Sequence, residues 1–265
     1  MTRSVLTAIL LACLTLPVQA EPARVVSINL CTDQLAMLLA APGQLVSVSH
    51  IARDPLSSAM AAEAARHPVN HGLAEEVFAL RPDLVLAGEY THRETVALLR
   101  RMGVRVETFA AAQDMEGVAA GIRAMGRALG RAAEGEALAT RFGADLARLR
   151  RDPAGGPRAA LYYANGYSLG DATLSGQILA AAGYRNIAGE AGLSAGGTLP
   201  LEVLVMAHPD LIVQGERHAT PSRSEEILTH PALAASPARR VEMADRDWIC
   251  GTPFVLRALA ALRAP

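Results

Sequence analysis

The stretch EEVFALRPDLVL, residues 75–86, carries the strongest indication of the fold, because its pattern returns later in the chain. Residues 202–213 read EVLVMAHPDLIV, and in both copies a glutamate stands seven positions before a Pro-Asp pair. Proline ends a helix, and the apolar run after each aspartate has the composition of a buried strand. Two copies of this helix–turn–strand unit predict two lobes of similar build.

Short β-branched runs alternate with alanine-rich helical stretches around both copies. In the first half we expect strands at residues 24–29, 45–49, 84–87 and 105–109 and helices at residues 32–40, 75–80 and 94–102, the first of them N-capped by Thr32. In the second half we expect strands at residues 159–164, 211–214 and near Val241, and helices at residues 174–182 and from Pro253. This alternation predicts mostly parallel sheets with helices on both faces.

Residues 114–151, between the two halves, have apolar residues at helical spacing and no strand signal. Gly130 divides this stretch, and residues 131–151 would make a helix about 30 Å long at the standard rise per residue. The sequence therefore predicts an α/β fold of two Rossmann-like lobes joined by one long α-helix, a rigid link that allows little lobe movement. The expected lobes are residues 21–130 and 153–265, with the linking helix at residues 131–152.

Residues 1–20 have the features of a signal peptide. Arg3 precedes an apolar run that is shorter than the roughly 20 residues of a membrane span. Val18-Gln19-Ala20 matches a cleavage signal, so we expect cleavage after Ala20 and a periplasmic location. A lipid anchor at Cys13 is the alternative, although the residue two positions before it, Leu11, is larger than that motif usually has.

The mature chain contains two cysteines, Cys31 and Cys250. An even number in an exported protein favours a disulfide, but the two are far apart in the sequence, which alone leaves open whether they meet. The formal net charge of the whole chain is −1, which argues against a nucleic-acid partner.

The chain resembles the periplasmic binding proteins of ABC importers for ferric siderophores, vitamin B12 and haem. The resemblance rests on the first strand RVVSIN at residues 24–29, the Glu-x6-Pro-Asp block in each lobe and the linking helix, and it covers the mature chain. It implies a protein that is not an enzyme, has no cofactor of its own and carries a small metal chelate to a membrane permease. A ferric siderophore is the first expectation for this cargo, with a corrinoid or haem as the alternatives.

Glu75 and Glu202 fall on the docking positions of the vitamin B12-binding relatives, in which one glutamate on each lobe enters an arginine pocket of the permease. The resemblance therefore implies that these two carboxylates dock the chain, with Glu76 as a substitute for Glu75. A glutamate in the first turn of a helix is also stabilised by about 0.3–1 kcal/mol without any partner, so a purely structural role is the alternative.

A cargo site is expected past the carboxyl ends of the strands, where open α/β sheets bind ligands. Aromatic faces suit a large chelate, arginine suits its acidic groups, and Tyr90 with His92 would suit haem iron. No zinc-site spacing is present, so no metal ligand is assigned. The candidate cleft residues are Asn29, Cys31, Thr32, His50, Arg53, Tyr90, His92, Arg93, Asn165, Tyr167, Arg217, His218 and Trp248, of which Tyr90, Tyr167 and Trp248 are the expected exposed aromatics.

Two other classes of function are open to this sequence. Gly166-Tyr-Ser168-Leu-Gly170 matches the nucleophile elbow of a serine hydrolase, with Asp210 and either His218 or His230 to complete a triad. Against it, a loop separates Ser168 from the next helix, no glycine run for an oxyanion hole lies upstream, and the long helix has no place in that fold. An exported adhesive protein is the third class, but paired lobes favour a cleft and its ligand.

Overall fold

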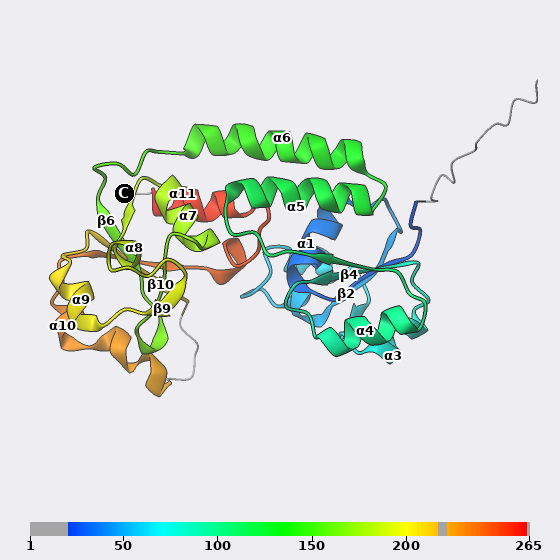
Figure 1. Ribbon diagram of the computed structural model, residues 1–265, viewed down its shortest axis with the longest axis horizontal. Helices are drawn as coiled ribbons and strands as arrows, with labels where there is room; N and C mark the ends of the chain where they lie inside the picture. Colours follow the sequence, from blue (N-terminus) through cyan, green and yellow to red (C-terminus); the bar gives the residue numbers. More distant parts are fainter. Residues whose placement is uncertain (1–20, 217–221, 264–265) are drawn as a thin grey trace, which may run out of the picture.

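Two α/β lobes lie side by side beneath a pair of long helices in the computed structural model (Figure 1). The structure describes residues 21–216 and 222–263. The described part of the first lobe is built on a parallel sheet with the strand order β3-β2-β1-β4-β5. Its strands are β1 Val25–Ser27, β2 Leu45–Ser49, β3 Val69–Asn70, β4 Leu84–Gly88 and β5 Val106–Phe109. Its helices are α1 Leu30–Leu39, the 3-10 helix η1 His50–Arg53, α2 Ala61–Ala64, α3 Ala74–Ala79 and α4 Arg93–Arg101.

The second lobe repeats this design with a parallel sheet of order β11-β10-β6-β8 and a separate antiparallel pair, β7 with β9. Its strands are β6 Arg158–Leu161, β7 Tyr167–Leu169, β8 Arg185–Asn186, β9 Gly196–Thr198, β10 Leu211–Gly215 and β11 Arg239–Met243. Its helices are α7 Leu174–Ala181, α8 Ile187–Glu190, α9 Leu201–Met206, α10 Pro231–Ala234 and α11 Val255–Leu262. The 3-10 helices are η2 Ala164–Gly166, η3 Arg223–Thr229 and η4 Asp245–Asp247.

The helices α5 Met115–Ala128 and α6 Ala132–Leu149 run beside each other above both lobes, and α6 carries the chain from the first lobe to the second (Figure 1). They approach closely where Gly126 faces Gly135: a Cβ on Gly126 would lie 2.8 Å from the Cα of Gly135, so the absence of a side chain permits the contact. One hydrophobic cluster continues from the first sheet through α5 and α6 to the second sheet. The lobes therefore share a core, in addition to the single helical crossing.

The sequence repeat is also a structural repeat. In the first lobe the Asp83 carboxylate accepts the backbone N–H of Arg24 at 3.0 Å, and the Arg24 guanidinium donates to carbonyl groups just after α3. In the second lobe the Asp210 carboxylate accepts the backbone N–H of Arg158 at 2.7 Å, and the Arg158 guanidinium donates to Ala207 just after α9. Each Pro-Asp pair thus joins the end of a short helix to the first strand of its lobe.

The predicted fold class is confirmed, and most predicted elements are present with ends shifted by one to three residues. One expectation was wrong: Asn29, not Thr32, is the N-cap of α1, because its side chain accepts the N–H groups of Cys31 and Thr32. The short elements β3, β7, β8, β9, α2, α8 and α10 were not predicted. No helix in the described ranges is both long and apolar enough to cross a membrane.

Candidate functional site

A cavity of about 140 Å³ lies where the lobes meet, at the carboxyl ends of β1 and β4. These two strands are neighbours, yet the chain leaves β1 toward β2 on the other side, so the cavity lies at the switch point that open α/β sheets use for ligands. The first lobe forms most of the wall and the second lobe contributes Ile249 and Gly251. The other lining residues are Asn29, Cys31, Thr32, Leu35, Gly88, Glu89, Tyr90, Phe109, Ala110, Ala111, Ala112, Gly117 and Gly121.

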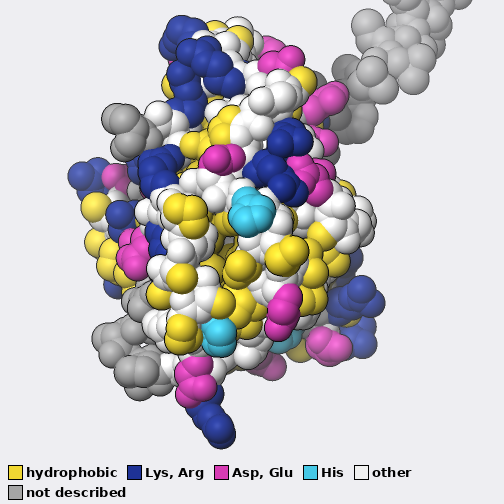
Figure 2. All heavy atoms as spheres, turned by 90° about the vertical axis from the view of Figure 1, so that its left-hand side faces the viewer, with side chains coloured by type: hydrophobic (Ala, Val, Ile, Leu, Met, Phe, Trp, Pro, Cys, Tyr) yellow, Lys and Arg dark blue, Asp and Glu magenta, His cyan; other side chains and the backbone are white. Residues whose placement is uncertain are grey.

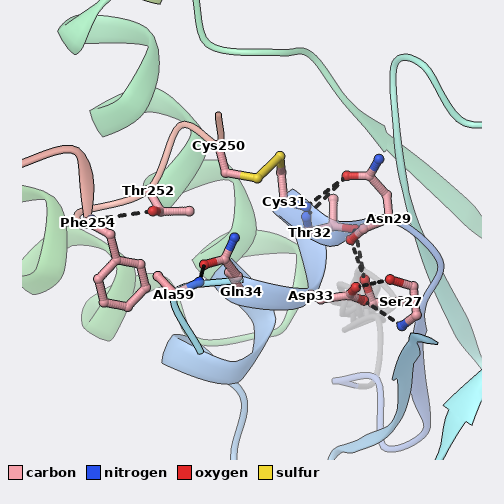
Figure 3. Close-up of a disulfide and its surroundings, with 11 residues drawn as sticks. Ser27, Asn29, Cys31, Thr32, Asp33, Gln34, Ala59, Cys250, Thr252 and Phe254 are labelled. Carbon is pink, nitrogen blue, oxygen red and sulfur yellow. Dashed lines mark hydrogen bonds between the residues drawn. A yellow bond between two sulfur atoms is a disulfide. The ribbon is translucent and has the colours of Figure 1, made fainter. Parts of the chain in front are cut away.

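Asn29 is fixed at the cavity by two neighbours. Its carbonyl oxygen Oδ1 caps α1 by accepting the N–H groups of Cys31 at 3.0 Å and Thr32 at 3.4 Å. A Cβ on Gly88 would lie 2.7 Å from the Asn29 carboxamide carbon, so glycine is required beside it. The amide nitrogen of Asn29 points away from α1 and is left as a donor for a ligand (Figure 3).

A layer of buried polar groups holds α1 against the sheet behind the cavity wall (Figure 3). The Thr32 and Ser27 hydroxyls lie 2.8 Å apart, and the Asp33 carboxylate accepts the backbone N–H of Ser49 at 3.1 Å and its hydroxyl. Burial raises the pKa of Asp33 to about 6, although the hydrogen bonds from Ser27 and Ser49 act in the opposite direction. This layer fixes the position of the residues that line the cavity.

The turn after β4 presents Glu89 and Tyr90 at the cavity mouth. The turn is closed by hydrogen bonds from Thr91 N–H to Gly88 O and from Gly88 N–H to the Thr91 hydroxyl, each 3.0 Å long. The Glu89 carboxylate accepts the backbone N–H of Ala111 at 3.1 Å. The Tyr90 side chain is 79% exposed, which leaves its phenol free to meet a ligand. Among the described lining residues only Glu89 carries a formal charge at neutral pH.

Cys31 and Cys250 form a disulfide with a Cα–Cα distance of 5.1 Å (Figure 3). Cys31 lies in the first turn of α1 and Cys250 lies in the second lobe, so the bond joins the lobes across 219 positions of sequence. The bond lies at the cavity, because Cys31 forms part of its lining.

A family model described as "Periplasmic binding protein" matches residues 25–241. The chain belongs to the periplasmic binding protein family. Two curated relatives are named "Cobalamin-binding protein", from two strains of Halobacterium salinarum. Each is 31% identical over 202 residues, which are 74% of this chain and 54% of the relative. The chain thus spans about half the length of the curated relatives it matches.

Solved structures of periplasmic binding proteins share the fold over nearly the whole chain. The heme-binding protein RhuT from Roseiflexus sp. RS-1 has a TM-score of 0.74 and 25% identity, covering 91% of this chain and 97% of its own. The heme-binding protein BhuT, in complex with two hemes, has a TM-score of 0.73 and 26% identity, covering 91% and 96%. The resemblance to periplasmic binding proteins of ABC importers inferred from the sequence is therefore confirmed.

Only part of the predicted cleft set lines this cavity of the binding protein. Asn29, Cys31, Thr32 and Tyr90 are brought together there. The other described candidates lie outside the lining, with His50 stacked on His71 at a ring distance of 5.0 Å and Arg53 bonded to carbonyl groups of its own lobe. His92, Arg93, Asn165 and Tyr167 are exposed. Arg217 and His218 lie outside the described residues.

The prediction that Trp248 is an exposed aromatic of the cleft was wrong. Its side chain is only 2% exposed, and its ring packs edge-on against Tyr163 with a centroid distance of 6.4 Å. The next residue, Ile249, is 47% exposed and lines the cavity instead. Both Ile249 and Gly251 lie in segment 248–252, which the strand-end rule places at the cleft, but the sequence analysis singled out Trp248 because no residue pattern shows which side of this segment turns inward. The signal that could have located them is their position beside Cys250.

The structure gives the serine hydrolase hypothesis no support. Ser168 is completely buried in β7, where its hydroxyl donates to the carbonyl of Leu161 at 2.5 Å. An antiparallel strand replaces the sharp strand-to-helix turn that a nucleophile elbow needs. His230, a proposed triad member, instead caps α10 by accepting the N–H of Ala232.

The two glutamates predicted to dock on a permease occupy matching positions. Glu75 lies in the first turn of α3 and Glu202 in the first turn of α9, and both are exposed. Glu76 differs, because its carboxylate accepts the backbone N–H of His71 at 2.7 Å and lies 3.1 Å from the His71 ring. These hydrogen bonds hold the pKa of Glu76 below its usual value and bind it to its own lobe.

No group of three or more histidine, cysteine, aspartate or glutamate side chains in the described part of the chain could hold a metal ion. The described cavity itself offers oxygen and amide groups rather than a set of metal ligands.

Proposed function

We propose that the chain binds a metal chelate between its lobes, with part of the chelate in the cavity of about 140 Å³, and delivers it to the membrane permease of an ABC importer. The observation that carries the proposal is the cavity at the sheet switch point, walled by both lobes. Export, with cleavage after Ala20 or a lipid anchor at Cys13, is part of the proposal, and both residues lie outside the described structure. The mass of the mature chain distinguishes these two forms.

A corrinoid is the cargo whose hydrogen-bonding groups best match those of the described lining. The lining offers an amide, a hydroxyl, a phenol and one carboxylate, from Asn29, Thr32, Tyr90 and Glu89, and its described residues include no cation. The rim of a corrinoid carries neutral carboxamides, which exchange hydrogen bonds with such groups. Acidic ferric siderophores would need arginine partners. The names of the curated relatives agree with this order, which places the corrinoid before the siderophore.

Haem is the second candidate, because of one observation. The Tyr90 phenol is 79% exposed at the mouth of the cavity, where it could serve as an axial ligand to haem iron. The heme-binding names of RhuT and BhuT support this alternative. His92, the partner of Tyr90 in the sequence prediction, does not belong to the cavity lining.

The cargo is tested by equilibrium dialysis of the purified chain against cyanocobalamin, haemin and a ferric hydroxamate in parallel. We expect cyanocobalamin to be retained at one molecule per chain, with its absorption bands in the protein compartment. Retention of haemin alone, with a band shift that Tyr90→Phe removes, would favour the second candidate. Retention of none of the three would contradict the proposed function.

The docking surface is proposed to centre on Glu75 and Glu202. Exposed apolar side chains accompany each glutamate, with Phe78 on α3 and both Val203 and Met206 on α9. Figure 2 shows the end of the molecule formed by the second lobe, where hydrophobic side chains gather between charged ones. A carboxylate among apolar groups pairs well with an arginine, because the surroundings exclude water from the contact.

Replacing Glu75 and Glu202 together with arginine should reduce cargo uptake by cells about tenfold or more, because like charges would then meet at the permease. The affinity of the purified chain for its cargo should not change, since neither residue lines the cavity. Uptake of labelled cargo by cells that depend on this chain measures the first effect, and dialysis measures the second.

The matched control is Glu116→Arg, which reverses the charge of an exposed glutamate in the first turn of α5. This variant has the same effect on a helix terminus but lies away from α3 and α9 in the sequence. Normal uptake in the double variant, or an equal loss in the control, would contradict the assignment of the docking residues.

A further inference from the structure

Residues 245–252 of the second lobe form a strap that crosses to the first lobe. The backbone N–H of Arg246 donates to the carbonyl of Leu56 at 3.2 Å. The guanidinium of Arg246 donates to the carbonyl of Pro55 at 3.0 Å. Both acceptors belong to the loop between η1 and α2, so one end of the strap is bonded to the first lobe.

The other end of the strap is held more tightly. Cys250 is bonded to Cys31 on α1, and it is only 1% exposed (Figure 3). The next residue, Gly251, lies so close to the first lobe that a Cβ there would be 2.4 Å from the Cβ of Ala112. A covalent bond and a close backbone approach therefore fix this end within the shared interior.

The strap is also anchored in its own lobe. Trp248 is buried against Tyr163, and its indole N–H donates to the Asp245 carboxylate at 3.5 Å. The backbone N–H groups of Trp248 and Ile249 both donate to the carbonyl of Asp245. With Trp248 turned inward, Ile249 turns toward the cavity. Because the strap is bonded to both lobes, a movement of one lobe relative to the other would also move the strap.

We propose that the Cys31–Cys250 disulfide is a latch that holds the strap against the first lobe, fixes the opening of the cavity and positions Ile249 against the cargo. The proposal rests on the proposed function, since it takes this cavity as the cargo site. The lobes are joined at two separate places, α6 and the strap, so they cannot rotate about α6 alone. A cavity fixed before binding saves the ordering cost that a mobile wall would add.

The latch opens by thiol–disulfide exchange with a dithiol. The dithiol gives two electrons and two protons to the sulfur–sulfur bond, which becomes the thiols of Cys31 and Cys250. The reductant itself closes to a cyclic disulfide. In an oxidising compartment the latch stays closed, which makes it a permanent part of the binding site.

The test compares the oxidised chain with the chain reduced by dithiothreitol, using cyanocobalamin and haemin as probes in equilibrium dialysis. We expect the reduced chain to bind its probe about tenfold more weakly or worse, because the wall that carries Ile249 is no longer fixed. Trp248 is the only tryptophan in the sequence, so its emission reports on the strap without any cargo. We expect reduction to shift this emission to longer wavelength and to increase its quenching by iodide.

Two control proteins distinguish loss of the latch from general loss of folding. The Cys31→Ala/Cys250→Ala variant should bind as weakly as the reduced chain. A chain whose two thiols are rejoined through a single methylene group by diiodomethane should keep its affinity in dithiothreitol; weak binding by this rejoined chain would overturn the proposal. Unchanged affinity and emission in a reduced chain with unchanged circular dichroism would also overturn it. If the oxidised chain binds neither probe, the proposed function fails, while the emission of Trp248 still tests the latch.

Discussion

Replacing both Cys31 and Cys250 with alanine should lower the free energy of unfolding by about 3–5 kcal/mol. The disulfide joins positions separated by 219 residues, and a loop of that size strongly restricts the unfolded chain when it is closed. Urea unfolding of the wild type and the variant at neutral pH, followed by circular dichroism, measures the difference.

The wild type unfolded in the presence of dithiothreitol provides the control, because it removes the same bond without changing a residue. Its stability should agree with that of the double variant to within about 1 kcal/mol. A Cys31→Ser/Cys250→Ser variant should be less stable than the alanine variant, since Cys250 is buried and a serine hydroxyl there would lack water. A loss below about 1 kcal/mol in all three would show that the cross-link contributes little.

Asp33→Asn should make the chain more stable than the wild type above neutral pH, by about 3 kcal/mol at most. Burial raises the pKa of Asp33 from 3.8 to about 6, so the folded chain binds its proton more tightly than the unfolded chain does. Between these two values stability falls as the pH rises, and above about pH 6 the full cost of the buried charge is present. Asparagine stays neutral and can still accept the backbone N–H of Ser49 and donate to its hydroxyl.

Urea unfolding of both proteins between about pH 4 and pH 8 measures this effect. The difference in the free energy of unfolding between Asp33→Asn and the wild type should grow as the pH rises. Asp54→Asn is the control of opposite sign, because hydrogen bonds from Ser57 and Leu56 hold the pKa of Asp54 below its usual value. That variant should be less stable than the wild type at neutral pH, with the gap closing in acid. A stability difference between Asp33→Asn and the wild type that stays constant across this pH range would contradict the raised pKa of Asp33.

The lobes and their linking helices could be predicted because their signals are local. Each Pro-Asp pair ends a helix and precedes a strand. The two copies have the same structural role, because Asp83 and Asp210 each accept a backbone N–H at the start of the first strand of their lobe. The helices α5 and α6 follow directly from apolar spacing interrupted at Gly130, which has a positive φ of 73°. Short strands such as β3, with two residues, have no periodicity to detect.

The candidate site was only partly predictable, because its second wall depends on contacts between distant parts of the chain. The rule that ligands bind past strand ends selected Asn29 and Tyr90, and both line the cavity. It could not show that Trp248 is buried against Tyr163 while Ile249 turns toward the cavity. The orientation of these two side chains depends on the tertiary packing of the strap, which the local sequence does not reveal.

The most direct test of the central claim, that cargo binds in the cavity between the lobes, fills the cavity with a side chain. Gly121 lines the cavity on α5, and no atom lies within 4 Å of a Cβ placed on it, so Gly121→Leu adds bulk without a direct clash at its Cβ. Gly143 on α6 is exposed and equally free of neighbours, so Gly143→Leu is the matched control for the gain in helix propensity. We predict that Gly121→Leu weakens cyanocobalamin binding about tenfold or more while Gly143→Leu binds like the wild type. Wild-type affinity in a folded Gly121→Leu chain would contradict the account.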